Sequence, residues 1–306
     1  MRNMFADTFF EAAQNDERLC TVVADISPAG SMSRFRDKFP RRFINTGVAE
    51  QIMIGIAAGM ALRGLKPFAY TIATFSIFRP YEFVRDDLCY QNLPVTVVGI
   101  GGGVNYSTLG PTHHALEDVA LATTLPNMQV IAPCDPAEVQ AATQWCIGQT
   151  NGPAYLRLGK AGEPVLTRDA IDPWQFGKLR YLRRGSEVCL LAYGPVTRIA
   201  CDVATRLEAQ GKSASVVSVH TLKPLDVAGL GEALARHKHV AVIEEMLPNG
   251  GLAGRVKQVA WEGKAACRID TFTLKDEFPH TYGSHEELLA SNGISADAIL
   301  AKLTRP

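Results

Sequence analysis

The sequence predicts an α/β protein of two consecutive domains, each a mainly parallel sheet flanked by helices. Short β-branched runs alternate with helical segments along the whole chain, and these runs are almost continuously apolar. Strands of that kind are buried on both faces, which is typical of parallel sheets covered by helices. A polar, proline-containing stretch near the middle of the chain separates the first series from the second.

The first series predicts a domain over residues 1–160. Asp135 followed by Pro136 is a strong helix start, because aspartate caps a helix and proline suits its first position. The expected strands are 21–26, 42–45, 66–71, 94–100, 129–132 and 153–158, and the expected helices lie near 49–62, 77–91, 116–124 and 136–148.

The second series predicts a domain over residues 181–306. Residues 161–180 carry Pro164 and Pro173 and lack clear periodicity, so they are expected to form a linker. The expected strands are 187–192, 214–219, 239–244 and 268–274. One helix is expected to start at Val196, a second to follow a cap at Asp226, and a third to lie near 251–262.

Composition excludes several functional classes. The 306 residues have a formal net charge of zero and no basic block interleaved with aromatics, so nucleic-acid binding is not indicated. No apolar run reaches the roughly 18 residues of a membrane span, and the N-terminal segment turns acidic where a signal peptide would be apolar. The seven cysteines are scattered and never spaced C-x-x-C, which favours reduced thiols and a cytoplasmic location.

Glu50 stands at the head of the most apolar helix-like run, GVAEQIMIGIAAGMAL, where it is the only charged residue. Removing a carboxylate from water without a partner is costly, or forces the group to take up a proton. Glu50 therefore either lies harmlessly at the helix start or serves a bound group that needs a buried carboxylate.

Three aromatic residues, Phe75, Phe78 and Tyr81, follow at a spacing of three in TFSIFRPYEF. On a helix this spacing places them on one face. Such a stripe is usually part of a core, and periodicity alone favours that interpretation. The alternative is a flat apolar wall for a planar heterocycle, where ring stacking adds to the burial of apolar area.

Two adjacent histidines, His113 and His114, lie between a Gly-Pro turn and a helix in LGPTHHALEDVAL. Catalytic groups often occupy such junctions, and imidazole can move protons near neutral pH. A solvated pair or a capping histidine is the structural alternative. Metal binding is less favoured, since no H-x-x-x-H or nearby ligand set accompanies the pair.

Arg157 falls at the end of the expected strand in GPAYLRLGK. Ligands gather outside the carboxyl ends of parallel strands, and a guanidinium there could hold a phosphate or a carboxylate. A structural ion pair explains Arg157 equally well. The GGG at 101–103 has neither the Rossmann spacing nor a P-loop lysine, so it does not indicate a nucleotide site.

Taken in order, the segments NTGVAEQ, ATFSIFRPYEFVRDDL, GPTHH and GPAYLR resemble the C-terminal half of a transketolase. The resemblance covers essentially the whole chain and comprises that family's pyrimidine-binding domain and its C-terminal domain. The later segments SVHTLKPLD and EEMLPNGGLAG also resemble the C-terminal domain. The resemblance implies a transferase of carbohydrate metabolism that moves a two-carbon ketol unit from a ketose to an aldose.

The resemblance also implies the cofactor, thiamine diphosphate, and roles for single residues. Glu50 matches the glutamate that favours the imino tautomer of the cofactor's pyrimidine ring. His113 matches a histidine that contacts the substrate and assists proton transfers, and with His114 it is expected to bind substrate. Arg157 matches an arginine that binds the sugar phosphate. The residues that match the aromatic wall against the pyrimidine are Phe75, Phe78 and Tyr81.

Part of the family's cofactor site is missing. The family holds diphosphate and Mg²⁺ with a GDG motif and a later asparagine in a preceding domain, and no GDG occurs here. The resemblance therefore implies a split transketolase, with a separate diphosphate-binding subunit and two copies of each chain in a heterotetramer. Gly55 and Gly59, four residues apart, would allow a partner helix to approach closely or could pack within the monomer.

Two departures from the family affect specificity. Leu109 stands where transketolases usually have aspartate, and GGGVNYSTL replaces a loop that usually begins with histidine. Both family residues bind sugar hydroxyls or the donor, so a less hydroxylated or modified sugar is expected. The alternatives are a deoxyxylulose-phosphate-synthase-like enzyme, the β subunit of a 2-oxo acid dehydrogenase, and a non-catalytic regulatory or scaffold subunit.

Overall fold

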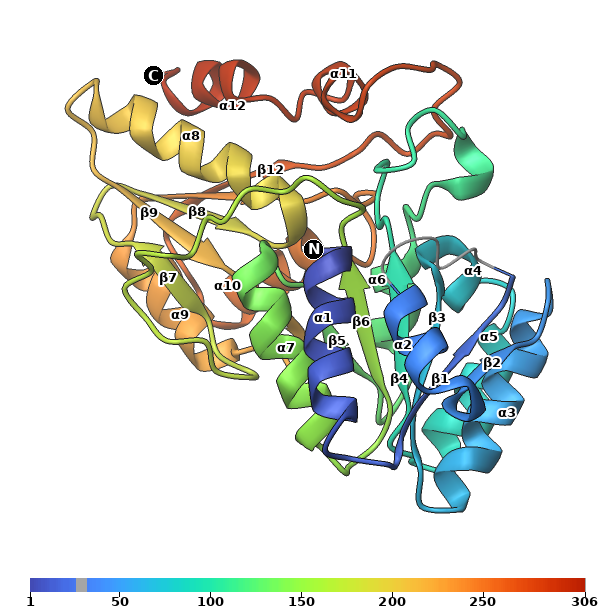
Figure 1. Ribbon diagram of the computed structural model, residues 1–306. Coiled ribbons are helices and arrows are strands. Elements are labelled where there is room, and N and C mark those ends of the chain that lie inside the picture. Colours follow the sequence, from blue (N-terminus) through green and yellow to red (C-terminus); the bar gives the residue numbers. More distant parts are fainter. Residues whose placement is uncertain (26–31, 306) are drawn as a thin grey trace.

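The computed structural model describes residues 1–25 and 32–305, which form two α/β domains that pack against each other (Figure 1). The expected fold class is confirmed. A seven-stranded sheet has the order β10-β5-β6-β4-β3-β1-β2, and a five-stranded sheet has the order β12-β11-β8-β9-β7. Each sheet is parallel apart from one antiparallel edge strand, β10 in the first and β7 in the second.

The six strands expected in the first half all form. They are β1 (Leu19–Val23), β2 (Phe43–Asn45), β3 (Lys66–Ile72), β4 (Thr96–Ile100), β5 (Gln129–Ile131) and β6 (Ala154–Leu158). Strand β1 starts and ends earlier than the expected 21–26, and Ile26 lies outside the described residues. Every residue of β1, β4 and β6 is buried, as expected of central parallel strands.

Strand β10 (Thr221–Lys223) was not expected. It comes from the second half of the chain and pairs antiparallel with β5, at the outer edge of the first sheet. Its three residues are too few to show a period, so the sequence carries no strand signal there. The first sheet is therefore completed by the second domain.

Helices cover both faces of the first sheet. On one face α1 (Arg2–Ala13) and α7 (Pro136–Gly148) pack side by side (Figure 1), over an aromatic cluster that includes Phe5, Phe9 and Phe68. Helix α7 starts as expected, since Asp135 accepts a hydrogen bond from the Glu138 amide at 2.8 Å. On the other face α3 (Glu50–Leu62) and α6 (Asp118–Thr124) contribute to a core that continues into the second domain.

The single helix expected at 77–91 is replaced by three shorter segments. The chain forms α4 (Ala73–Ile77), a short helix α5 (Tyr81–Phe83) and a π-helical segment η2 (Val84–Tyr90). Pro80 lacks an amide hydrogen and its ring clashes with the preceding turn, which explains why the helix is interrupted there. The interruption separates Phe75 from Tyr81.

The second sheet comprises β7 (Arg180–Arg183), β8 (Val188–Ala192), β9 (Ala214–Ser218), β11 (His239–Ile243) and β12 (Arg268–Phe272). Its helices are α8 (Thr197–Glu208), α9 (Val227–Arg236) and α10 (Leu252–Glu262), close to the expected positions. Two further short helices, α11 (His285–Ser291) and α12 (Ala296–Leu303), were not expected; α12 packs on α8 (Figure 1).

Buried polar contacts fasten the two halves together. Glu138 of α7 accepts hydrogen bonds from the Cys134 amide at 2.9 Å and from Ser218 Oγ of β9 at 3.0 Å. It also pairs with Arg180 of β7 at 3.2 Å. Residues 161–179 contain no helix or strand, and within them Thr167 donates to Asp135 at 2.9 Å. This segment is therefore held against the first sheet's helix α7 by a hydrogen bond to its cap, Asp135.

Among the described residues, no helix is both long and apolar enough to cross a bilayer. All seven cysteines are free, and burial raises the pKa of several, that of Cys20 to about 12. Thiols with such raised pKa values carry little thiolate at neutral pH and are unreactive.

His220, next to β10, should make stability depend on pH. It is fully buried, and its ring stacks on the Trp174 ring with 4.9 Å between the ring centres. Burial lowers the pKa of His220 from 6.5 to about 3. Between these values the unfolded chain binds a proton that the folded chain does not. We expect stability to fall with decreasing pH below about 6.5, by up to about 1.4 kcal/mol per unit from this group.

Urea unfolding at pH 7 and pH 5 tests this contribution. The stability difference between the wild type and His220→Gln should change between the two pH values, whereas exposed His280→Gln should follow the wild type. Equal pH dependence in wild type and His220→Gln would refute the assignment.

Candidate active site at the carboxyl ends of the first sheet

Three of the residues singled out from the sequence follow the carboxyl ends of strands in the first sheet. Glu50 is the first residue of α3, after β2; Phe75 lies in α4, directly after β3; and His113 lies in a 3₁₀ turn (Pro111–His113) after β4. Parallel strands place their carboxyl ends along one edge of the sheet, where ligands of α/β proteins bind.

Glu50 is buried, with 2 % of its surface exposed, and it has a partner. Arg79 donates from one nitrogen, Nη1, to both carboxylate oxygens, at 3.0 and 3.1 Å. The ion pair explains how the protein tolerates this carboxylate in an apolar helix. Arg79 itself is 44 % exposed, so the pair joins a buried carboxylate to a guanidinium at the surface.

Arg79 also connects Glu50 to the aromatic residues. Its guanidinium carbon lies 4.3 Å from the centre of the Phe75 ring, and the Phe75 ring meets the His113 ring edge-on at 5.3 Å. Glu50, Arg79, Phe75 and His113 thus form a continuous row. Glu50, Phe75 and His113 were expected from the sequence, and Arg79 was not.

Phe78 and Tyr81 lie differently from Phe75. Both are half-buried and pack against the core beneath the row. The Tyr81 hydroxyl donates to the Leu121 carbonyl of α6 at 3.1 Å. The core interpretation left open by the sequence therefore applies to these two rings, whereas Phe75 contacts Arg79 and His113.

His113 and His114 occupy contrasting environments. His113 is half-buried and shares a hydrogen bond with the Thr112 hydroxyl at 3.0 Å. His114 is 2 % exposed, and neither ring nitrogen has a hydrogen-bond partner among the described residues. Burial lowers the pKa of His114, although the Glu245 carboxylate opposes the shift. His113 is therefore the more accessible of the two rings.

Arg157 forms the structural ion pair that the sequence left open. It is 3 % exposed, and its Nε donates to Asp118 at 2.8 Å; the same Asp118 oxygen accepts from Tyr155 at 2.7 Å. Burial by itself would lower the pKa of Arg157, but Asp118, together with two buried tyrosines and Glu245, raises it overall. A buried, paired guanidinium does not favour the expected role in binding a sugar phosphate.

The GGG loop after β4 is explained by three close neighbours. A Cβ on Gly101 would lie 2.2 Å from the Tyr106 ring, one on Gly102 would lie 2.5 Å from the Arg157 guanidinium, and one on Gly103 would lie 2.3 Å from the Glu245 carboxyl carbon. Gly101 and Gly103 also have φ values of +74° and +69°, which favour glycine. The loop is packed tightly between both domains.

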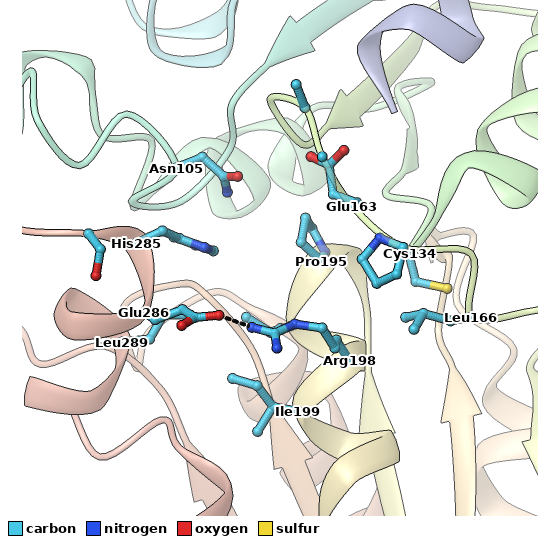
Figure 2. A pocket seen from close by; sticks show the side chains of 15 residues that line it. Asn105, Cys134, Glu163, Leu166, Pro195, Arg198, Ile199, His285, Glu286 and Leu289 are labelled. Atoms are coloured by element: carbon cyan, nitrogen blue, oxygen red, sulfur yellow. Dashed lines mark hydrogen bonds and ion pairs between the residues drawn. The ribbon is translucent and has the colours of Figure 1, made fainter.

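A separate cavity of about 520 Å³ lies between the domains (Figure 2). Asn105, Glu163, Arg198 and His285 are among the residues around it, and Arg198 pairs there with Glu286 at 2.6 Å. None of the residues in the row described above lines this cavity.

The row of side chains supports a definite set of chemical tasks. A buried carboxylate can hold a hydrogen-bond donor of a ligand, an aromatic ring can pack against a planar heterocycle, and an imidazole beside them can move protons. Arg79 was missed from the sequence, although its position within FSIFRP placed it beside the aromatic residues. Asp118 and Glu245 carried no local signal, because their partners are distant in the chain.

Family models match nearly the whole chain. The model described as transketolase, pyrimidine binding domain, matches residues 1–162, and that described as transketolase, C-terminal domain, matches residues 177–299. An apulose-4-phosphate transketolase subunit of Actinobacillus succinogenes is 32% identical over 98% of this chain and 96% of its own length. The 6-deoxy-6-sulfo-D-fructose transketolase subunit SqwH of a Clostridium species is 34% identical over 86% of this chain and 81% of its own length.

Longer enzymes and a solved structure are similar as well. The 1-deoxy-D-xylulose-5-phosphate synthase of Acaryochloris marina is 32% identical over 90% of this chain, which covers 43% of that enzyme. A solved split-gene transketolase, described as an inactive β4 tetramer, has a TM-score of 0.88 and 33% identity, and the match covers 98% of this chain and 95% of the other.

Proposed function

Because this chain belongs to the transketolase family, we propose that it is the C-terminal subunit of a split transketolase and transfers a two-carbon ketol unit from a ketose to an aldose. One observation carries the proposal: the row of Glu50, Phe75 and His113 along the carboxyl edge of the first sheet. We further propose that residues 1–160 form the pyrimidine-binding domain, 161–180 the linker and 181–306 the C-terminal domain of a cytoplasmic protein.

The proposed cofactor is thiamine diphosphate, which supplies a carbanion that accepts the ketol unit. Glu50 fits the task of holding its pyrimidine ring. Among the described residues, a single nitrogen of Arg79 contacts the carboxylate, and a carboxylate has about four acceptor sites. Glu50 can therefore accept a further hydrogen bond from a ring nitrogen, and Phe75 lies where a flat ring can pack.

His113 is the proposed acid–base group. It is the imidazole of the row, held by Thr112 on one side and by the Phe75 ring on another. Its place beside Phe75 suits proton transfer to and from a sugar hydroxyl. Phe78 and Tyr81 would support the aromatic wall from the core side, and His114 and Arg157 would stabilise the loops beneath the substrate.

A second chain is proposed to complete the site. The relatives of matching length are named as transketolase subunits, and this sequence contains no GDG motif for diphosphate and Mg²⁺. The exposed side of α3 supports such a partner, since Ile52 and Leu62 are 57 % and 62 % exposed and Gly55 and Gly59 have open space above them. Two copies of each chain would form the heterotetramer.

A modified sugar is the proposed substrate class. Leu109 is 49 % exposed at the tip of the loop before His113, and it offers no hydrogen bond to a hydroxyl. The relatives described above are named for apulose 4-phosphate and for 6-deoxy-6-sulfo-D-fructose, and the second of these is a deoxy, sulfonated sugar. A synthase of deoxyxylulose phosphate is the second candidate, because such enzymes match the same chain over part of their length.

Calorimetry and a ketol-transfer assay test the proposal. Thiamine diphosphate with Mg²⁺ is titrated into this chain, into a GDG-containing partner chain, and into their mixture. We expect tight binding and ketol transfer only in the mixture. Binding without any transfer from ketoses, together with carbon dioxide release from pyruvate, would favour the synthase, and no binding in the mixture would refute the proposed cofactor.

A further inference from the structure

We infer that Glu245 and His285 of the second domain form a positioning pair that fixes the loop 103–107 against His113. Glu245 follows β11 and His285 begins α11, so neither residue belongs to the domain that carries the candidate site. The functional part of this inference rests on the proposed function, whereas its structural part does not.

The Glu245 carboxylate holds two elements at once. Its Oε1 accepts a hydrogen bond from the Val104 amide and one from His285 Nε2, both at 2.7 Å. The side chain of Glu245 is 1 % exposed, and the side chain of His285 is 28 % exposed toward the cavity of Figure 2. Hydrogen bonds to a charged acceptor are roughly twice as strong as neutral ones, so Glu245 is a firm anchor for the loop.

The pair is electrostatically matched. Burial alone would lower the pKa of His285, but Glu245 raises it overall, which favours the charged imidazolium beside the carboxylate. On the other side, Gly103 comes so close to Glu245 that any side chain there would collide with the carboxyl group. The loop at Gly103 and Val104, the Glu245 carboxylate and the His285 imidazole are therefore in direct contact across the domain boundary.

Two routes lead from this anchor to the site. Gly103 and Ala115 exchange both backbone hydrogen bonds, at 3.0 and 2.9 Å, which fixes the chain just after His113 and His114. Tyr106, two residues beyond Val104, meets the His113 ring edge-on at 6.4 Å. Releasing Val104 would loosen both supports of His113 while leaving Glu50 and Phe75 in place.

Amide hydrogen exchange in the isolated full chain tests the anchor. In Glu245→Ala the peptide covering 103–107 should exchange roughly tenfold faster or more, because a hydrogen bond to a charged group is lost. Glu245→Gln, which keeps an acceptor oxygen, should restore most of the protection, and His285→Ala should give an intermediate increase. The matched control is Glu286→Gln, which alters a carboxylate of the same cavity that accepts no hydrogen bond from the loop and should leave the exchange of 103–107 near the wild-type rate.

The peptide covering β8 separates a local effect from general destabilisation. If β8 exchange stays at the wild-type rate while 103–107 accelerates, the anchor is supported. If 103–107 keeps its protection in Glu245→Ala, or if β8 accelerates equally, the inference is overturned.

Kinetics of the complex assembled with the partner chain test the effect on function. A loosened His113 should raise KM for the sugar roughly tenfold in Glu245→Ala, with a smaller change in kcat, and Glu245→Gln should restore KM. A merely structural role would lower kcat by reducing the active fraction and leave KM unchanged. If the wild-type complex shows no ketol transfer, the proposed function fails, and the exchange experiment still decides whether the anchor exists.

Discussion

Replacing Glu50 by glutamine should lower kcat of the assembled enzyme by about 10³-fold at saturating thiamine diphosphate. Glutamine keeps the size of the side chain but removes its negative charge, and a positioned acid–base group contributes typically 10²–10⁴ in rate. The measurement is steady-state ketol transfer, and calorimetry in the same complex should show weakened cofactor binding.

Glu82→Gln is the matched control for this variant. Glu82 is an exposed carboxylate close in sequence to Arg79, the partner of Glu50. The Glu82→Gln complex should therefore retain wild-type activity. Urea unfolding of both variants shows whether the fold survives. Full activity of Glu50→Gln in a folded complex would contradict the catalytic role and would favour a scaffold subunit.

Replacing Asp118 by alanine should destabilise the chain by about 3–5 kcal/mol, because it leaves the buried Arg157 guanidinium without its partner. Asp118 is fully buried and also accepts from the Tyr155 hydroxyl. Urea unfolding measures the loss. With a total stability of about 5–15 kcal/mol expected for a domain, this single change could leave little of the fold.

The exposed pair Arg236–Glu232, whose side chains are 66 % and 68 % exposed, provides the control. Glu232→Ala should cost less than about 1 kcal/mol, as surface pairs contribute little. The double variant Asp118→Leu with Arg157→Met should regain part of the stability, since it removes both charges. A cost for Asp118→Ala as small as that of Glu232→Ala would refute a structural role for the pair and would reopen Arg157 as a substrate contact.

Much of the fold follows from local sequence patterns. Apolar runs set the strands of both sheets, and Asp135 with Pro136 marks the start of α7. The same kind of reasoning failed at 77–91, where the aromatic spacing suggested one helix and Pro80 instead divides the segment. It also failed for β10, whose position is decided by an edge of β5 that is about 90 residues earlier in the chain.

The candidate site was predictable only where chemistry leaves a local signature. Glu50 was conspicuous because a lone acid stands in an apolar helix, and His113 because it follows a Gly-Pro turn. The partners of Arg157 and Glu245 could not be predicted. Arg157 pairs with Asp118 across 39 positions, and Glu245 accepts a hydrogen bond from the Val104 amide across 141. Contacts at that separation depend on how the sheets pack, which no short window of sequence records.

The pairing of β10 with β5 limits how this protein can be dissected. A fragment that ends shortly after β6 would retain six strands of the first sheet but expose the outer edge of β5 and the core that α6 shares with α9 and α10. Unpaired strand edges recruit other chains, so such a fragment is prone to aggregate. Gene truncation is therefore a poor route to a minimal version of the site, and point substitution in the full-length chain is the sound one.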